Sequence, residues 1–122
     1  VAEIGSFEPD HFIAIGGGSV IDAAKAIRVF YECPTVTFEE LSVDFADFRK
    51  RAVNFPQLGK TKLVAIPTTS GTGSEVSPAS VITDKEKNTK ISIFDYGVAP
   101  DIAILDSELT LNLPVNITAD TG

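Results

Sequence analysis

Residues 16–19 of the sequence are three glycines followed by a serine, placed directly after the apolar residues 13–15. This order predicts a buried strand that ends in a glycine turn, where a helix begins. The start of a helix leaves about four backbone N–H groups unpaired and carries roughly half a positive charge, and glycine lets a phosphate approach the main chain closely. The glycine turn, residues 16–19, therefore predicts an anion site, and a phosphate-bearing ligand is the first hypothesis.

The same residues also fit a purely structural interpretation. Ser19 is followed three positions later by Asp22, as in a capping box whose side chains satisfy the free N–H groups of the helix. The two interpretations are compatible. Two known phosphate-binding patterns are not matched: Ile21 stands at the third glycine position of G-x-G-x-x-G, and Asn54 stands where a P-loop ending at residues 59–61 needs its first glycine.

A second segment, the hydroxyl loop (residues 68–74), follows the apolar run of residues 63–66 and consists of Thr, Ser and Gly. It offers hydrogen-bond donors and acceptors without bulk, which suits a sugar-phosphate. An ordinary Ser/Thr/Gly loop is the structural alternative. Ligands of open α/β sheets bind at the carboxyl ends of the strands, so two strand-to-loop transitions of this kind favour a ligand site.

Apolar runs and a helical repeat supply the elements that would position the two loops. Val20, Ala24 and Ile27 recur at helical spacing, which predicts a helix over residues 20–30. Three apolar runs predict parallel strands at residues 12–15, 62–66 and 102–105, the last of them buried. We therefore expect an α/β fold, a partial Rossmann-like parallel sheet with flanking helices and a β-hairpin.

The hairpin and a second helix are expected between and after these strands. Residues 80–83 and 89–93 flank a charged stretch and predict the hairpin. Thr37 and Glu40 form a capping-box pattern that predicts a helix starting after Thr37. In that helix one face would carry Phe38, Leu41, Phe45 and Phe48.

Charge and cysteine content exclude several classes of protein. A chain of 122 residues with 43% hydrophobic residues can bury one modest core. Its net charge of −7 argues against nucleic acid and anionic membranes as partners. The single cysteine, Cys33, excludes an internal disulfide, and no signal-like or membrane-length apolar run is present, so a cytoplasmic location is expected.

The two loop motifs closely resemble those of the iron-containing alcohol dehydrogenase family. The first is Gly-Gly-Gly-Ser-x-x-Asp-x-x-Lys at residues 16–25, and the second is Pro-Thr-Thr-Ser-Gly-Thr-Gly-Ser-Glu-Val at residues 67–76. The resemblance covers nearly the whole chain. Residues 38–41 and 48–51 look like the alcohol dehydrogenase half of the bifunctional aldehyde-alcohol dehydrogenases.

The resemblance implies that the chain contacts NAD, the preference for NAD over NADP being an expectation from the subfamily. Backbone amides of the glycine turn and the Ser19 hydroxyl would bind the pyrophosphate. Asp22 would hold the turn or contact a ribose hydroxyl, unless it only pairs with Lys25 on the helix. Lys90 would approach the nicotinamide ribose, unless it is an outward-facing strand lysine. The implied cofactor-binding residues are Gly17, Gly18, Ser19, Asp22, Thr68, Thr69, Thr72 and Lys90.

In a complete enzyme the resemblance implies hydride transfer between a primary alcohol, with ethanol expected, and its aldehyde, with Fe²⁺ polarising the substrate oxygen. We expect residues 1–122 to be a partial dinucleotide-binding domain, inactive alone, with the iron ligands in a helical domain outside this chain. No catalytic or metal-binding residue is assigned, since a catalytic metal site needs about three ligands and the sequence has one histidine, His11, and one cysteine.

Two further classes of function stay open. The chain could be an assembly module that dimerises or exchanges elements through exposed edge strands, and a homo-oligomer is expected in either case. It could also be a non-redox protein that binds a nucleotide or phosphosugar. An aspartate shortly after residue 122 of the parent sequence, with a histidine one helical turn later, would favour the dehydrogenase.

Overall fold

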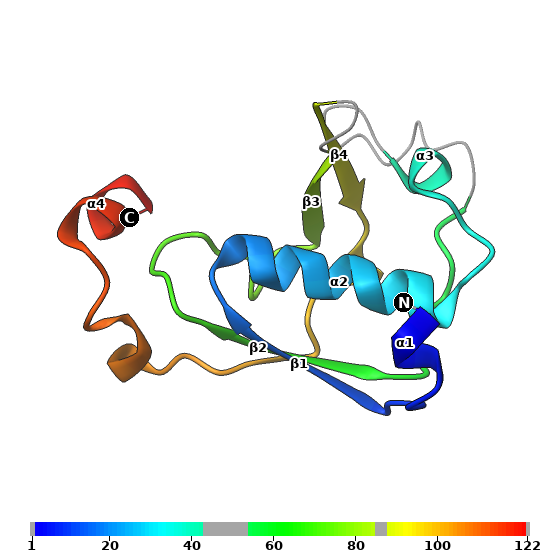
Figure 1. Cartoon of the computed structure of the whole chain (residues 1–122), viewed down its shortest axis with the longest axis horizontal. Helices are drawn as coiled ribbons and strands as arrows, with labels where there is room; N and C mark the ends of the chain where they lie inside the picture. Colours follow the sequence, from blue (N-terminus) through cyan, green and yellow to red (C-terminus); the bar gives the residue numbers. More distant parts are fainter. Residues whose placement is uncertain (1, 43–53, 85–87, 122) are drawn as a thin grey trace.

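The computed structural model describes residues 2–42, 54–84 and 88–121. Its main elements are a three-stranded sheet, one long helix and an upright hairpin, as Figure 1 shows. The remaining elements are short and lie near the two ends of the chain or between the strands. They are α1 (Ala2–Gly5), α3 (Phe38–Leu41), the 3-10 helices η3 (Tyr96–Val98) and η4 (Ser107–Thr110), and α4 (Val115–Thr121).

The sheet is parallel and has the strand order β1-β2-β5. Strand β1 (His11–Gly16) pairs along its whole length with β2 (Lys62–Pro67), and β2 pairs with the short β5 (Ile102–Ala103). The strands expected near residues 12–15 and 62–66 are thus confirmed, as is the α/β fold class. Because the strands are parallel, the glycine turn after β1 and the hydroxyl loop after β2 leave the same edge of the sheet.

Helix α2 (Gly18–Glu32) covers one face of this sheet, as Figure 1 also shows. Ala14 of β1, Ile21 of α2 and Leu63 and Ala65 of β2 form the buried cluster between them. The predicted helix over residues 20–30 is confirmed, and the structure extends it by two residues at each end.

The opposite face of the sheet is not covered by the described residues. Ile13 and Ile15 of β1 are 65% and 58% exposed, and Ile102 of β5 is 51% exposed. The prediction that the strand after residue 101 is buried was therefore wrong. Its apolar sequence suits burial, but parallel strands are buried only where helices cover both faces, and the described chain places α2 on one face alone.

A second core joins α2 to the hairpin. The hairpin strands β3 (Ala79–Asp84) and β4 (Thr89–Phe94) pair antiparallel, as predicted. Val29 of α2, Leu41 of α3, Ile93 of β4 and Val98 of η3 are fully or almost fully buried together. This cluster fixes the base of the hairpin against the long helix.

Helix α3 confirms the predicted start and differs from the predicted length. Thr37 and Glu40 form both bonds of a capping box. The helix ends at Leu41, because Ser42 has extended backbone and bridges to Ile93 of β4. The expected continuation of the helix face through Phe45 and Phe48 lies outside the described residues.

The far end of α2 is held by a buried network of charged groups. Glu32 accepts hydrogen bonds from the N–H groups of Gly59, Lys60 and Thr61 and from the Thr61 hydroxyl. Burial alone would raise the pKa of Glu32, but these bonds outweigh it and lower the pKa from 4.5 to about 2. Residues 59–61, which resemble the end of a P-loop in sequence, thus bind a side chain of their own protein.

Arg28 extends the same network to the neighbouring strands. Its guanidinium donates to the Thr61 carbonyl at 2.8 Å, contacts Glu32 at 3.3 Å and pairs with Asp101 at 3.0 Å. Asp101 also accepts from the Leu63 N–H, which ties the start of β5 to β2. The network lies at the amino ends of the strands. The glycine turn and the hydroxyl loop follow the carboxyl ends of the strands and take no part in it.

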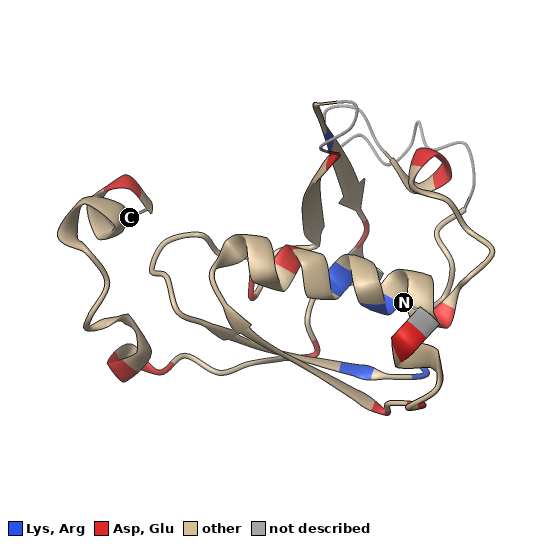
Figure 2. Cartoon of the chain, in the orientation of Figure 1, with Lys and Arg blue, Asp and Glu red and all other residues tan. Residues whose placement is uncertain are grey.

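Charged residues are spread unevenly over the fold. Among the described residues, Figure 2 shows Asp and Glu in many segments and Lys and Arg on α2, near the start of β2 and on the hairpin. No helix in the described ranges combines the length and the apolar character needed to cross a membrane.

Candidate cofactor site

The glycine turn forms the start of α2 without any side-chain cap. Gly17 is the N-cap residue, and its carbonyl accepts from the N–H groups of Val20 and Ile21 at 3.0 and 3.1 Å. No side chain caps this helix end, so the capping-box interpretation of Ser19 and Asp22 was wrong. Helical hydrogen bonding begins at Val20, which leaves the earlier N–H groups of the helix start available to an anion.

Asp22 bonds to the hairpin instead of the helix start. Its carboxylate accepts from the Val81 N–H at 3.1 Å and contacts Lys25 Nζ at 3.4 Å. The pairing of Asp22 with Lys25, one of the alternatives from the sequence, is therefore present. The Asp22 carbonyl also accepts from the Ser80 hydroxyl at 2.7 Å.

The hydroxyl loop lies against the glycine turn. The Thr68 N–H donates to the Gly16 carbonyl at 3.0 Å, which joins the first residue of the loop to the turn. A Cβ atom built on Gly17 would lie 3.3 Å from the Thr69 side chain, and one on Gly18 would lie 3.0 Å from Ser74 Oγ. The structure thus brings the two predicted segments together.

The Thr69 hydroxyl is buried at this contact and lacks a partner. Its Oγ1 atom has no hydrogen bond among the described residues. A buried hydroxyl without a partner costs free energy, roughly 1–3 kcal/mol, so such groups are rare and are usually satisfied by a protein group, an ordered water, an ion or a ligand. Thr69 Oγ1 lies on the side of the loop that faces Gly17, 3.3 Å from where a Cβ atom of that residue would be.

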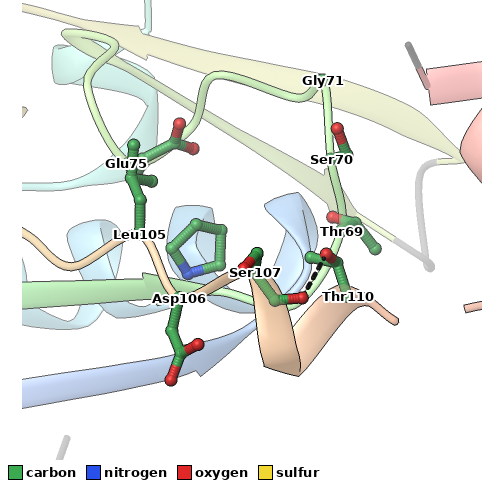
Figure 3. A pocket seen from close by; sticks show the side chains of 9 residues that line it. Thr69, Ser70, Gly71, Glu75, Leu105, Asp106, Ser107 and Thr110 are labelled. Atoms are coloured by element: carbon green, nitrogen blue, oxygen red, sulfur yellow. Dashed lines mark hydrogen bonds between the residues drawn. The ribbon is translucent and has the colours of Figure 1, made fainter. Parts of the chain in front are cut away.

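A pocket of about 350 Å³ opens next to Thr69, between the hydroxyl loop and the segment after β5. Figure 3 shows polar side chains around it, with the Thr110 hydroxyl donating to the Ser107 carbonyl at 2.9 Å. The lining residues are Pro67, Thr69, Ser70, Gly71, Glu75, Leu105, Asp106, Ser107 and Thr110. The pocket lies at the carboxyl ends of β2 and β5, where ligands of α/β sheets bind.

The remaining predicted residues are placed less centrally. Thr72 is exposed but lies beside Gly18, and its hydroxyl accepts from the Ser74 N–H at 3.4 Å. Ser19 is exposed and lines an open apolar groove between β1 and α2. Lys90 is exposed on β4 opposite Thr83, towards the hairpin tip, and no contact within the described chain joins it to the glycine turn.

Two residues of this region were missed by the sequence analysis. Ser74 is 8% exposed and packs against Gly18. Its position inside the hydroxyl loop was a signal that could have identified it. Lys25 is fully buried and bonds to Ser77 and Ala79. Its burial could not be read from the sequence, because its partners lie more than fifty residues away.

The described residues form no cluster of three His, Cys, Asp or Glu side chains that could hold a metal ion. His11 contacts the neighbouring Asp10 at 2.9 Å, and both side chains are mostly exposed. Cys33 ends α2, and burial together with the nearby Glu32 raises the pKa of its thiol, which disfavours the reactive thiolate.

Residues 1–107 match the family model described as iron-containing alcohol dehydrogenase. An aldehyde-alcohol dehydrogenase from Streptococcus pneumoniae is 56% identical over 118 residues, which are 96% of this chain and 13% of that protein. The chain therefore spans only a small part of this relative.

Solved structures agree with the family match. An iron-containing alcohol dehydrogenase from Thermococcus thioreducens superposes with a TM-score of 0.86 at 42% identity, covering 98% of this chain and 30% of that one. A sulfoacetaldehyde reductase from Bifidobacterium kashiwanohense, solved in complex with NAD⁺, gives a TM-score of 0.76 at 36% identity over the same shares of the two chains.

Proposed function

The chain belongs to the iron-containing alcohol dehydrogenase family, and we propose that it forms the NAD-binding part of a larger enzyme of that family. One observation carries the proposal: a buried hydroxyl without a partner, Thr69 Oγ1, faces a glycine turn with free helix amides. The relative solved with NAD⁺ supports the choice of ligand.

In this proposal the glycine turn binds the cofactor pyrophosphate. The N–H groups of Gly18 and Ser19 point out of the helix start and donate to phosphate oxygens, aided by the positive end of the helix dipole. The Thr69 hydroxyl supplies a further hydrogen bond, and the absence of side chains at Gly17 and Gly18 lets the hydroxyl loop lie directly against the turn. When bound, NAD supplies the hydride acceptor or donor.

The neighbouring pocket, which Thr69 lines, would take the nicotinamide half of the cofactor. Thr68 and Thr72 of the same loop stay proposed contacts to it. Lys90 and Asp22 stay proposed contacts to ribose hydroxyls. For Asp22 this role must coexist with its bonds to Val81 and Lys25.

For the whole enzyme we propose the interconversion of a primary alcohol, ethanol first, and its aldehyde, in the cytoplasm. The name of the pneumococcal relative supports this reaction, and a Fe²⁺ ion held outside this chain would polarise the substrate oxygen. This chain alone is proposed to bind NAD and not to turn over alcohol.

A threonine-to-valine substitution at residue 69 tests the proposed function. Valine keeps the shape of threonine and removes the unpartnered hydroxyl, so Thr69→Val should leave the unliganded chain as stable as before, or more stable by up to about 1 kcal/mol. Its affinity for NAD, measured by calorimetry, should fall by about tenfold. Thr35→Val, at an exposed site after α2, is the matched control and should change neither quantity. A Thr69→Val chain that binds NAD like the wild type would contradict the proposal.

The uncovered sheet face favours a second candidate, an assembly module. Ile13, Ile15 and Ile102 form an apolar surface of a kind that parallel sheets normally bury. Sedimentation velocity over a wide range of concentrations tests it: association without NAD binding would favour assembly, and a monomer that binds NAD would favour the cofactor site. A non-redox nucleotide-binding protein would instead bind AMP as tightly as NAD in the same titration.

A further inference from the structure

Lys25 is a fully buried lysine in the middle of α2. Its ammonium donates to the Ser77 carbonyl at 3.0 Å, the Ser77 hydroxyl at 3.1 Å and the Ala79 carbonyl at 2.7 Å, and it contacts the Asp22 carboxylate at 3.4 Å. An ammonium group has three hydrogens, so the backbone and hydroxyl acceptors of residues 77 and 79 account for all of them.

The segment that Lys25 binds connects the hydroxyl loop to the hairpin. Ser77 is the last residue of a turn in which the N–H groups of Val76 and Ser77 donate to the Gly73 carbonyl. Ala79 is the first residue of β3. Asp22, one helical turn before Lys25, fixes the next residues through Ser80 and Val81.

The hydroxyl loop is therefore anchored at both ends. At its start, the Thr68 N–H bonds to the Gly16 carbonyl. At its end, Lys25 holds Ser77 to the same helix whose first turn forms the anion site. Between these anchors, Thr69, Thr72 and Ser74 lie against Gly17 and Gly18 by close contact rather than by hydrogen bonds. Loops with few bonds open easily, so the anchors determine how well the loop stays on the turn.

We propose that Lys25 is a positioning residue, which sets NAD affinity without touching NAD by holding Ser77 and Ala79 so that the hydroxyl loop stays against the glycine turn. The inference rests on the proposed function for its effect on NAD, whereas its effect on the loop stands by itself. Burial keeps the ammonium away from solvent and from the pocket, so a direct contact with the cofactor is not part of the role.

The test compares Lys25→Met with Lys62→Met in the full 122-residue chain. Methionine keeps the unbranched apolar stem of lysine, is one heavy atom shorter and removes the donors. Lys62 is a matched control because it also pairs with a carboxylate, Asp101, but lies at the amino end of β2, away from the site. Amide hydrogen exchange followed by NMR reports the loop, and calorimetry reports NAD binding.

In Lys25→Met, the Val76 and Ser77 amides should exchange about tenfold faster, while the amides within β1 and β2 keep the wild-type rate. The dissociation constant for NAD should rise by about tenfold. Lys62→Met should change neither. Ser77→Ala removes one acceptor and should shift both readouts in the same direction by a smaller factor, which keeps the test decisive if Lys25→Met does not fold.

The inference would be overturned if the amides of residues 76 and 77 exchanged at the wild-type rate in both Lys25→Met and Ser77→Ala. Faster exchange that spreads evenly over β1 and β2 would also overturn it, because that result marks a merely structural role. If the wild-type chain shows no NAD binding, the proposed function fails, and the exchange rates still decide whether Lys25 positions the loop. Faster loop exchange with unchanged NAD affinity would overturn the link between the anchor and the cofactor.

Discussion

At residue 18 a side chain would have to enter space that the hydroxyl loop already occupies. A Cβ atom there would lie 3.0 Å from Ser74 Oγ and 3.3 Å from Thr72 Cβ. Both distances are shorter than ordinary van der Waals contact, so any side chain must push the loop away from the turn or cover the amides that face it. Glycine at this position therefore keeps the loop and the helix start in contact.

Gly18→Val should therefore weaken NAD binding by about a hundredfold or more, because it blocks the approach to the helix amides and displaces the Thr72 and Ser74 side chains. Calorimetric titration with NAD measures the loss. Gly59→Ala is a control, since a Cβ at residue 59 meets no atom within 4 Å, and its affinity for NAD should stay unchanged. A Gly18→Val chain with the wild-type dissociation constant would show that the phosphate binds elsewhere.

At the scale of elements, α2 links the two edges of the sheet. Its first turn faces the hydroxyl loop, its middle holds the hairpin through Asp22 and Lys25, and its last turn holds residues 59–61 through Glu32. One helix thus sets the position of three segments that are far apart in sequence. Changes at its last turn should affect stability, and changes in its first two turns should affect ligand binding.

Glu32 provides the stability prediction. Its folded-state pKa is lowered to about 2 from 4.5, so its contribution is fully present above about pH 4.5 and is lost as the pH falls towards 2. The shift corresponds to roughly 3 kcal/mol. Glu32→Gln should lower the free energy of unfolding by about that amount at pH 7. The difference in free energy of unfolding between the wild type and the variant should shrink between pH 4.5 and 2. Urea denaturation measures both.

The exposed Glu108→Gln variant serves as the control for this experiment and should denature like the wild type at every pH. A Glu32→Gln deficit that stays constant from pH 7 down to pH 2 would mean that the carboxylate form of Glu32 is not what stabilises the end of α2.

Local patterns explain what could be predicted from the sequence. The apolar runs and the helical spacing of Val20, Ala24 and Ile27 predicted β1, β2, α2 and the hairpin, because periodicity and glycine placement act within a few residues. The contact between the two loops also followed, since parallel strands end at one edge. The bonds of Lys25 to Ser77 and of Glu32 to Gly59 could not be predicted, because they join residues more than twenty-five positions apart. The exposure of Ile102 depends on what covers the sheet, which the strand's own sequence does not encode.

At the scale of the whole molecule, the described residues place the two loops together at the carboxyl ends of the strands and leave one face of the sheet uncovered. The first feature suits binding of a dinucleotide, and the second suits packing against further polypeptide, in agreement with the 13–30% of its relatives that the chain spans. Under the proposed function, the ligands of the metal ion that polarises the substrate lie outside this chain.

We therefore expect this chain to form no NADH from ethanol and NAD in the presence of Fe²⁺, whereas the full-length parent forms it, as followed by absorbance at the NADH wavelength. Turnover by the chain alone would mean that it holds a metal site. That result would contradict the proposal that this chain binds NAD and that the iron ligands lie outside it.

The most direct test of the central claim is an NMR titration of the 122-residue chain with NAD, read from the backbone amide signals. The account predicts that the signals of Gly17, Gly18 and Thr69 move together and saturate at one NAD per chain, while those of residues 59–61 stay in place. Unmoved signals at the glycine turn and the hydroxyl loop at millimolar NAD, or movements confined to other segments, would contradict the claim that this chain forms the cofactor site.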